Sequence, residues 1–232
     1  MMRIEFLVEE QSAEEALKHL LPRLIDGRAQ WKLINLSSKY KLLKVLPQRL
    51  AAYRRCIDQS EDLRIVVLVD RDLDDCIALK RQMEDTAKSV GLSTKSVPGP
   101  DGRFLVVNRI VIEELESWFI GDPVALRKAF TGLPSMDPTK GIFRNPDNGG
   151  SWEALHRFLK RHGIYKSSYP KIDAARRIAP HLGLQSNRSR SFQVFLDGVE
   201  SLLTQPASPS TSSCLPERSQ KGSTPATSKK EG

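Results

Sequence analysis

Acidic residues occur in three short segments whose spacing suits the binding of a divalent cation. Glu9 follows an apolar run, Asp70 and Asp72 follow a second one, and Glu114 and Glu116 lie within a third apolar segment. Carboxylate oxygens are hard ligands of the kind that Mg²⁺ or Mn²⁺ prefers. Carboxylates in apolar sequence also need partners, and a metal ion supplies one. The sequence therefore indicates a Mg²⁺ (or Mn²⁺) site.

Each acidic segment also has a simpler interpretation. In extended backbone the i, i+2 spacing directs Asp70 and Asp72 to the same side, where they would share a cation. The alternative is an acidic helix entrance, because Asp is favoured at helix caps and first turns. In the third segment, Glu113 and Glu116 would share the solvated face of an amphipathic helix. The local backbone decides between these alternatives.

The elements that position these acids alternate between strand and helix patterns. The first helix is predicted to start with a capping-box spacing at Ser12 and Glu15, and Pro47 marks a kink or a new start in the second helix. Asp74 or Asp75 is predicted to cap the third helix, and Gly91 to end it. The pattern predicts strands at 4–8, 32–36, 65–69, 94–97 and 104–107, with helices between the first four strands. This order predicts an α/β fold with a mostly parallel sheet flanked by helices, whose carboxyl edge gathers the acids.

The sequence pattern and the composition divide the chain into three parts. Residues 1–122 form the predicted metal-binding α/β core, and residues 123–205 form a helical C-terminal extension packed on it, with the clearest helices at 152–159 and 172–178. Residues 206–232 are rich in Ser, Thr, Pro and Lys and contain one large aliphatic residue, so they are predicted to be a disordered tail.

Composition fits a soluble globular protein. The 232 residues carry a net charge of +8, and 39% are hydrophobic. No apolar run approaches the roughly 18 residues of a membrane span, and no signal core follows Met1, so a cytoplasmic location is expected. Three widely spaced cysteines favour reduced thiols. The basic balance favours an acidic partner such as nucleic acid.

Several other side chains are candidates with weaker patterns. Arg188 and Arg190 are predicted to contact nucleic-acid phosphates, or alternatively to cap and pair locally. Trp118 and Trp152 are expected to pack in the interior rather than to stack on bases. The four histidines lack metal-ligand spacing, and neither a nucleophile elbow nor a P-loop motif occurs.

Three signatures resemble those of small bacterial Toprim-like proteins, in particular the family called domain of unknown function 4276. They are F-L-V-E-E-Q-S-A-E-E-A-L (6–17), V-V-L-V-D-R-D-L-D-D-C (66–76) and I-E-E-L-E-S-W-F-I-G-D (112–122). Further similarity extends through G-G-S-W-E-A-L, P-K-I-D-A-A-R-R-I-A-P and N-R-S-R-S-F, so that it covers about residues 3–200. The resemblance implies a Toprim-like (Rossmann-like) sheet.

The resemblance also implies site roles. Toprim domains of topoisomerases, primases and OLD-type nucleases use a glutamate and a D-x-D pair to hold Mg²⁺, which corresponds to Glu9, Asp70 and Asp72. By similarity to OLD-type nucleases, Asp70, Asp72, Glu114 and Glu116 would hold one ion, and Glu9 with Asp70 a second. Lys171 resembles a nuclease lysine that offsets phosphoryl charge, and its alternative is a solvated lysine at a helix start.

Two functions from different classes follow. The first is a Mg²⁺-dependent nuclease or other phosphodiester-processing enzyme acting on nucleic acid, with an ABC-like ATPase partner and a role in defence against foreign DNA. The second is a catalytically idle regulatory or nucleic-acid-binding subunit of an ATPase complex. Glu10, where the family usually has glycine, and Ala13, where it has an acid, favour the second. A phosphatase or phosphate-accepting domain using Asp70 or Asp72 ranks last.

Overall fold

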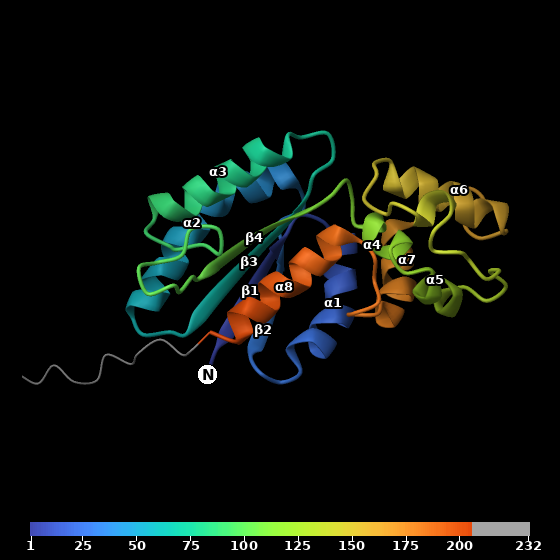
Figure 1. Cartoon of the computed structure of the whole chain (residues 1–232). Coiled ribbons are helices and arrows are strands. Elements are labelled where there is room, and N and C mark those ends of the chain that lie inside the picture. The colour runs from blue at the N-terminus through green and yellow to red at the C-terminus, as the bar shows by residue number, and fades with distance from the viewer. Residues whose placement is uncertain (206–232) are drawn as a thin grey trace, which may run out of the picture.

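A four-stranded sheet lies at the centre of the part of the chain that the structure describes, residues 1–205. In this computed structural model all strand pairs are parallel and the strand order is β2-β1-β3-β4 (Figure 1). The strands are β1 (Arg3–Val8), β2 (Gln30–Asn35), β3 (Leu63–Asp70) and β4 (Val106–Val111). The expected α/β fold with a parallel sheet is therefore confirmed.

Helices cover both faces of this sheet (Figure 1). Phe6 of β1 and Val66 of β3 face α1 (Gln11–Ile25) and α8 (Arg190–Leu203). The alternate residues, such as Leu7 and Val67, face α2 (Lys39–Asp58) and α3 (Cys76–Ser89). Because successive side chains of a strand point to opposite faces, the two apolar cores are separated by the sheet.

Buried apolar strands fix the register that aligns the acids. All eight residues of β3 are buried, as expected for an inner strand of a parallel sheet. Val8 at the end of β1 pairs with Leu68 of β3, so Glu9 and Asp70 emerge at the same edge. The pairing continues past the strand ends, since the backbone N–H of Arg71 donates to the Val111 carbonyl.

The chain beyond β4 is helical in the described residues, as predicted. It contains α4 (Glu116–Ile120), α5 (Pro123–Ala129), α6 (Ser151–Arg161) and α7 (Lys171–Ile178), two 3₁₀ turns (Gly141–Phe143 and Ala179–His181), and α8. α7 packs on α1, and α8 returns to the sheet beside β4. One continuous apolar core joins these helices to the sheet.

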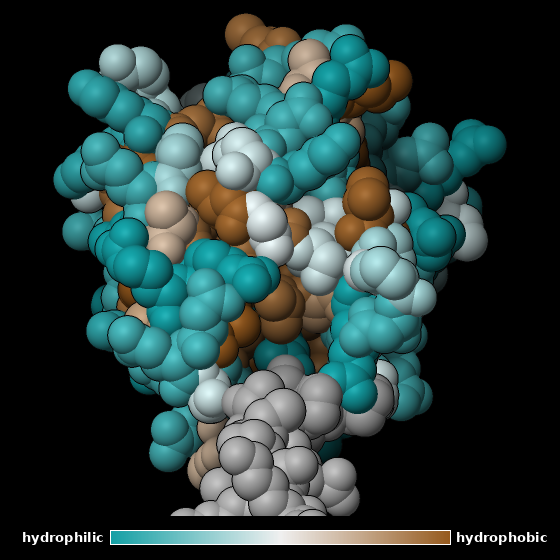
Figure 2. All heavy atoms as spheres, turned by 90° about the vertical axis from the view of Figure 1, so that its left-hand side faces the viewer, coloured by the Kyte–Doolittle hydropathy of each residue, from teal (hydrophilic) through white to brown (hydrophobic). Residues whose placement is uncertain are grey.

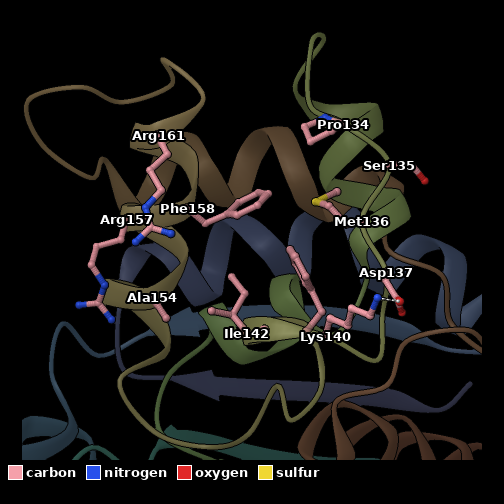
Figure 3. A pocket seen from close by; sticks show the side chains of 12 residues that line it. Pro134, Ser135, Met136, Asp137, Lys140, Ile142, Ala154, Arg157, Phe158 and Arg161 are labelled. Carbon is pink, nitrogen blue, oxygen red and sulfur yellow. Dashed lines mark ion pairs between the residues drawn. The ribbon is translucent and has the colours of Figure 1, made fainter.

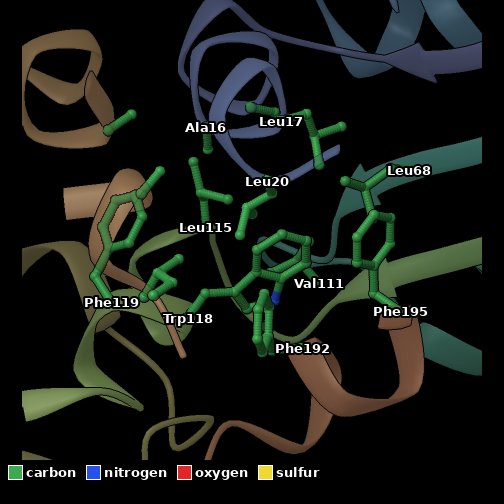
Figure 4. Packing of buried hydrophobic residues seen from close by; sticks show 14 of the residues in the cluster. Ala16, Leu17, Leu20, Leu68, Val111, Leu115, Trp118, Phe119, Phe192 and Phe195 are labelled. Atoms are coloured by element: carbon green, nitrogen blue, oxygen red, sulfur yellow. The ribbon is translucent and has the colours of Figure 1, made fainter. Parts of the chain in front are cut away.

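Trp118 lies at the centre of that core (Figure 4). Its ring centroid lies 5.0 Å from those of both Phe192 and Phe195, and its indole N–H donates to Ser191 Oγ at 3.1 Å. Buried aromatic residues of this kind dominate core energetics. The predicted packing role of Trp118 is confirmed, whereas Trp152 is only partly buried and lies alongside His156.

The face at the amino ends of the strands differs in its side chains from the carboxyl edge, where the acids lie. Viewed from this side, hydrophilic residues surround a group of apolar ones in the middle of the face (Figure 2). Val97, in the loop before β4, is 61% exposed. The acids that follow β1 and β3 lie at the opposite edge of the sheet.

Several local predictions were wrong. Ser12 lies inside α1, whose N-cap is Glu10, so the capping box does not form. α2 continues through Pro47, so no new helix starts there, while the alternative of a kink stays a prediction. Residues 94–97 form a turn, closed by a bond from the Val97 N–H to the Thr94 carbonyl, instead of a strand. The last strand covers 106–111 and not 104–107, because residues 106–111 are the ones that pair with Ile65–Asp70 of β3.

Other predictions concern the surface and the C-terminal residues. No helix in the described residues is long and apolar enough to cross a membrane. Cys56 and Cys76 are free thiols, in agreement with the sequence. Cys214 and the predicted disordered tail, 206–232, lie outside the described residues. The boundary at residues 122 and 123 stays a prediction.

Candidate functional site

The three acidic segments meet at the carboxyl edge of the sheet. Glu9 directly follows β1, Asp70 ends β3, and Glu114 and Glu116 follow β4. The backbone N–H of Asp72 donates to the Glu113 carbonyl at 3.0 Å, which holds the second and third segments side by side. The prediction that separate strand ends direct acids to one place is borne out by this arrangement.

Glu9 and Asp70 are the two buried carboxylates at the strand ends, 7% and 6% exposed. Glu9 Oε1 accepts a hydrogen bond of 2.5 Å from the Asp70 backbone N–H. Burial raises the pKa of Glu9 to about 7, although this hydrogen bond and Lys39 oppose the rise. Burial, followed by the charges of Glu9 and Glu10, raises the pKa of Asp70 well above its ordinary value.

Asp72 does not continue the extended backbone that its spacing assumed. Its φ of 50° is left-handed, and its side chain is half exposed. Lys39, the first residue of α2, contacts Asp72 Oδ2 at 2.6 Å and Asp74 Oδ2 at 2.7 Å. Lys39 also donates to the carbonyls of Asp70 and Arg71, at 2.9 and 3.0 Å. Lys39, at the junction of β2 and α2, therefore binds residues 70–74, which form the end of β3 and the loop before α3.

Burial would lower the pKa of the Lys39 ammonium, but its hydrogen bonds to Asp72 and Asp74 outweigh burial and raise the pKa. Lys39 thus stays charged in this loop. Asp75, the next acid along, caps α3 by accepting from the Ala78 N–H at 2.7 Å. The D-R-D-L-D-D segment therefore combines a buried carboxylate, a lysine-bound pair and an ordinary helix cap.

Glu113 lies outside any helix, with a φ of 64°. Its carboxylate forms an ion pair with Arg71 and accepts a weak hydrogen bond of 3.3 Å from the Gly150 N–H. α4 begins only at Glu116, and that residue is fully buried. The alternative of an amphipathic helix with Glu113 and Glu116 on a solvated face is therefore wrong.

Glu114 links the acidic edge to the helical part. Its Oε1 lies 3.3 Å from Lys171 Nζ, and its Oε2 accepts from the Trp152 N–H at 3.3 Å. Lys171 is the first residue of α7, so its placement at a helix start is confirmed, yet its ammonium faces the acids. Burial raises the pKa of Glu114, and Lys171 opposes this rise.

Glu116 is the least compensated of the acids. Its side chain is fully buried, and neither carboxylate oxygen has a hydrogen-bond partner among the described residues. Burial raises its pKa to about 7 despite the nearby Lys171 charge. Burial raises the pKa of the nearby Tyr169 hydroxyl well above its ordinary value, and the charge of Glu116 raises it further.

Lys171 sits among several of these carboxylates. Burial would lower the pKa of its ammonium, but the charges of Glu116, Glu10 and Glu114 raise it above its ordinary value. A cavity of about 370 Å³ opens beside Lys171, between the start of α1 and the end of β2.

The acids converge on one edge without forming a finished coordination shell. Within residues 1–205 no group of three or more His, Cys, Asp or Glu side chains is arranged to hold a metal ion. Glu9, Asp72 and Glu114 instead bond to protein groups. Their side chains would have to turn to coordinate an ion together.

The chemistry of the donor set nevertheless fits a divalent cation. The Glu116 oxygens are buried without partners, and Asp70 is surrounded by like charges. A buried carboxylate in such a setting favours its protonated form unless a cation compensates it. The edge therefore has the oxygen ligands and the negative charge that a Mg²⁺ or Mn²⁺ ion requires.

The two predicted phosphate-contacting arginines occupy the start of α8 and the loop before it. Both are exposed. The Arg188 guanidinium donates to the Pro138 carbonyl, and the Arg190 backbone N–H donates to Asp147 Oδ2 at 2.6 Å. Arg190 also lines a cavity of about 260 Å³ with Cys76 and Ile112, close to the segments that carry the acids. Their role in binding nucleic acid stays a prediction.

Sequence reasoning missed Lys39, Arg71 and Tyr169. Lys39 follows β2, so the rule that strand ends gather functional groups would have included it. Arg71 lies between the two aspartates, but its partner Glu113 is distant in sequence. Tyr169 stood out in the sequence only as an aromatic residue that could stack on a base, since only the folded chain brings its hydroxyl close to Glu116.

Fold and site together define an α/β protein with a cluster of carboxylates at the carboxyl edge of a parallel sheet. The family described as "Domain of unknown function (DUF4276)" matches residues 8–200, and the chain belongs to this family. No curated protein and no solved structure showed a significant match to the chain.

Proposed function

We propose that the protein is a Mg²⁺-dependent, Toprim-like nuclease or another phosphodiester-processing enzyme that acts on nucleic acid. One observation carries the proposal: buried carboxylates from three segments of the chain meet at the carboxyl edge, and neither oxygen of Glu116 among them has a hydrogen-bond partner of good geometry in the described residues. A site with this excess of buried negative charge suits a divalent cation. The likeness of the three acidic signatures to Toprim proteins supports the same chemistry.

In this proposal the acids share two ions. Asp70, Asp72, Glu114 and Glu116 would hold the first ion, and Glu9 with Asp70 would hold the second. When bound, such ions lower the pKa of water and stabilise charge on the leaving oxygen.

Lys171 supplies a fixed positive charge close to Glu114 and Glu116 and beside a cavity, which suits a phosphate in the transition state. Arg188 and Arg190 are proposed to contact the nucleic-acid backbone. An ABC-like ATPase partner and a role in defence against foreign DNA rest on the family resemblance, as does the expected cytoplasmic location.

A second candidate is a catalytically idle subunit that binds an ATPase or nucleic acid. The pairing of Asp72 with Lys39 and of Glu114 with Lys171 favours it, because the protein's own cations already compensate these acids. Glu10 at the N-cap of α1 brings a further negative charge where the family usually has glycine. In this candidate the acids are structural.

Calorimetric titration with Mn²⁺ and Mg²⁺ separates the two candidates. The wild type is expected to bind metal, and the Asp70→Asn/Asp72→Asn variant is expected to lose binding while circular dichroism shows it folded. A matched control, Asp85→Asn/Asp101→Asn, removes two exposed carboxylates away from the edge and should bind as the wild type does.

Cleavage assays on single- and double-stranded DNA and RNA, first alone and then with an ATPase partner, follow if binding depends on these acids. A folded wild type that binds neither ion would refute the enzyme and leave the idle subunit. Metal binding that survives equally in both double variants would refute the assignment of the site to Asp70 and Asp72.

A further inference from the structure

A cavity of about 570 Å³ lies on the helical part of the protein, between α6 and the loop that follows α5 (Figure 3). Phe158 points into it from α6, and Met136 faces it from the opposite loop (Figure 3). Phe143, packed edge-on against Phe158 with ring centroids 5.2 Å apart, contributes to the apolar lining. This cavity offers a planar group an apolar and aromatic environment.

A second cavity, of about 300 Å³, adjoins the first. The two share Gly141, Ile142 and Ala154 in their linings, so they form one groove. The second cavity ends at the start of α6, where Ser151 is 1% exposed and its hydroxyl has no hydrogen-bond partner. A buried hydroxyl without a partner costs free energy, and a ligand atom in the cavity would satisfy it.

The groove carries positive charge along its length. Arg144 lines the second cavity, and Arg157 and Arg161 lie on one wall of the first (Figure 3). All three are exposed, and none forms an ion pair with an acid in the described part of the chain. Asp137, which also lines the first cavity, is paired with Lys140 at 3.6 Å.

The start of α6 adds a partial positive charge to that of the arginines. α6 has eleven residues and no side-chain cap at Gly150, so its N-terminal N–H groups and helix dipole favour a negative group nearby. Glu113 and Glu114 contact the N–H groups of Gly150 and Trp152, but these carboxylates are paired with Arg71 and Lys171. Glu153 in the first turn of α6 forms no ion pair within residues 1–205, but it lines neither cavity.

We propose that this groove binds a nucleotide, with the base in the first cavity against Phe158 and the phosphate in the second between Arg144 and Ser151. Aromatic side chains stack on bases of any sequence, and guanidinium groups bind phosphate through paired hydrogen bonds. The cavity volumes fall in the range of small-molecule sites, about 300–1,000 Å³. The two chemically different halves match the two halves of a nucleotide.

The nucleotide would be either a free mononucleotide or one unit of a nucleic-acid strand, since both present the same base and phosphate. The groove is lined by none of the carboxylates assigned to the metal. The inference therefore stands apart from the proposed metal site, and binding in the groove needs no divalent ion.

The test is calorimetric titration of the full chain with adenosine 5′-monophosphate, adenosine and inorganic phosphate in the presence of EDTA. We expect the monophosphate to bind at least tenfold more tightly than adenosine or phosphate alone. Arg144→Ala and Ser151→Ala should each weaken monophosphate binding, the first by tenfold or more, and leave adenosine binding unchanged. Phe158→Leu should weaken the binding of both adenosine and adenosine 5′-monophosphate.

Arg127→Ala is the matched control, because Arg127 is an exposed arginine of α5 that lines neither cavity. A monophosphate affinity no better than that of phosphate would overturn the proposal, as would an equal effect of Arg144→Ala and Arg127→Ala. Asp70→Asn/Asp72→Asn should bind the monophosphate as the wild type does, which separates this groove from the metal site.

A titration with an eight-residue oligodeoxyadenylate distinguishes the two sources of the nucleotide. Tighter binding of the oligonucleotide than of the monophosphate, weakened by Arg144→Ala, would assign the groove to a nucleic-acid strand. Tighter binding of the monophosphate would assign it to a free nucleotide. Oligonucleotide binding that Arg144→Ala leaves unchanged, together with no monophosphate binding, would refute a nucleotide site here.

Discussion

Removing the charge of Glu116 should stabilise the protein in alkaline solution. Burial raises the pKa of this carboxyl from an ordinary 4.5 to about 7. Because the folded state holds the proton more tightly, its contribution to stability is fully present below pH 4.5. It is lost as the pH rises through 7. One pKa unit corresponds to about 1.4 kcal/mol, so the complete loss is about 3 kcal/mol.

Glu116→Gln removes this loss, since glutamine is neutral at every pH. Between pH 4.5 and pH 8.5, the free energy of unfolding of the variant should therefore rise by about 3 kcal/mol relative to that of the wild type. Urea unfolding followed by circular dichroism in EDTA measures both values. Asp85→Asn, which removes an exposed charge, should show no such change.

A relative change below about 1 kcal/mol would refute the reasoning, since it would mean that Lys171 and its neighbours already compensate Glu116. Adding Mg²⁺ at pH 8.5 extends the test. An ion that binds the folded state alone stabilises it by mass action. The wild type should therefore gain more stability from Mg²⁺ than Glu116→Gln does.

Two further substitutions test the surroundings of the edge. Lys39→Met should lower the free energy of unfolding by about 2 kcal/mol, because it leaves Asp72 and two backbone carbonyls without the donor that they share. Urea unfolding measures this change, and Lys41→Ala, which removes an exposed lysine, is the control. Gly121→Ala should cost about 1–3 kcal/mol, because the added Cβ would overlap Asn187 Oδ1; an unchanged thermal midpoint would contradict this close contact.

The positions of the acids could be predicted because they depend on strands. The apolar run before Asp70 and the shorter run before Glu9 both form parallel strands in register, and such strands deliver their last residues to one edge. Periodicity and turn residues were enough to predict the order of the first three strands and the helices that follow them, but they added a strand at 94–97 that does not form. Trp118 was likewise predictable, since an aromatic residue among apolar neighbours usually packs in the interior.

The direction of each acid could not be predicted, since it depends on contacts between distant segments. Asp72 leaves the extended backbone with a positive φ and turns to Lys39, which lies thirty-three positions earlier in the chain. Glu113 has a left-handed backbone, and its carboxylate contacts Arg71 and the Gly150 N–H. Spacing rules assume regular structure, and both residues lie just beyond it.

Both ends of the described chain lie at the amino edge of the sheet. The Arg3 N–H at the start of β1 donates to the Asp62 carbonyl, and Gln205 accepts from the Phe104 N–H before β4. α8 also runs toward this edge (Figure 1). An affinity tag, fluorophore or surface linker fused before Met1 would therefore extend away from the carboxylates and leave their approach open to a long polymeric ligand.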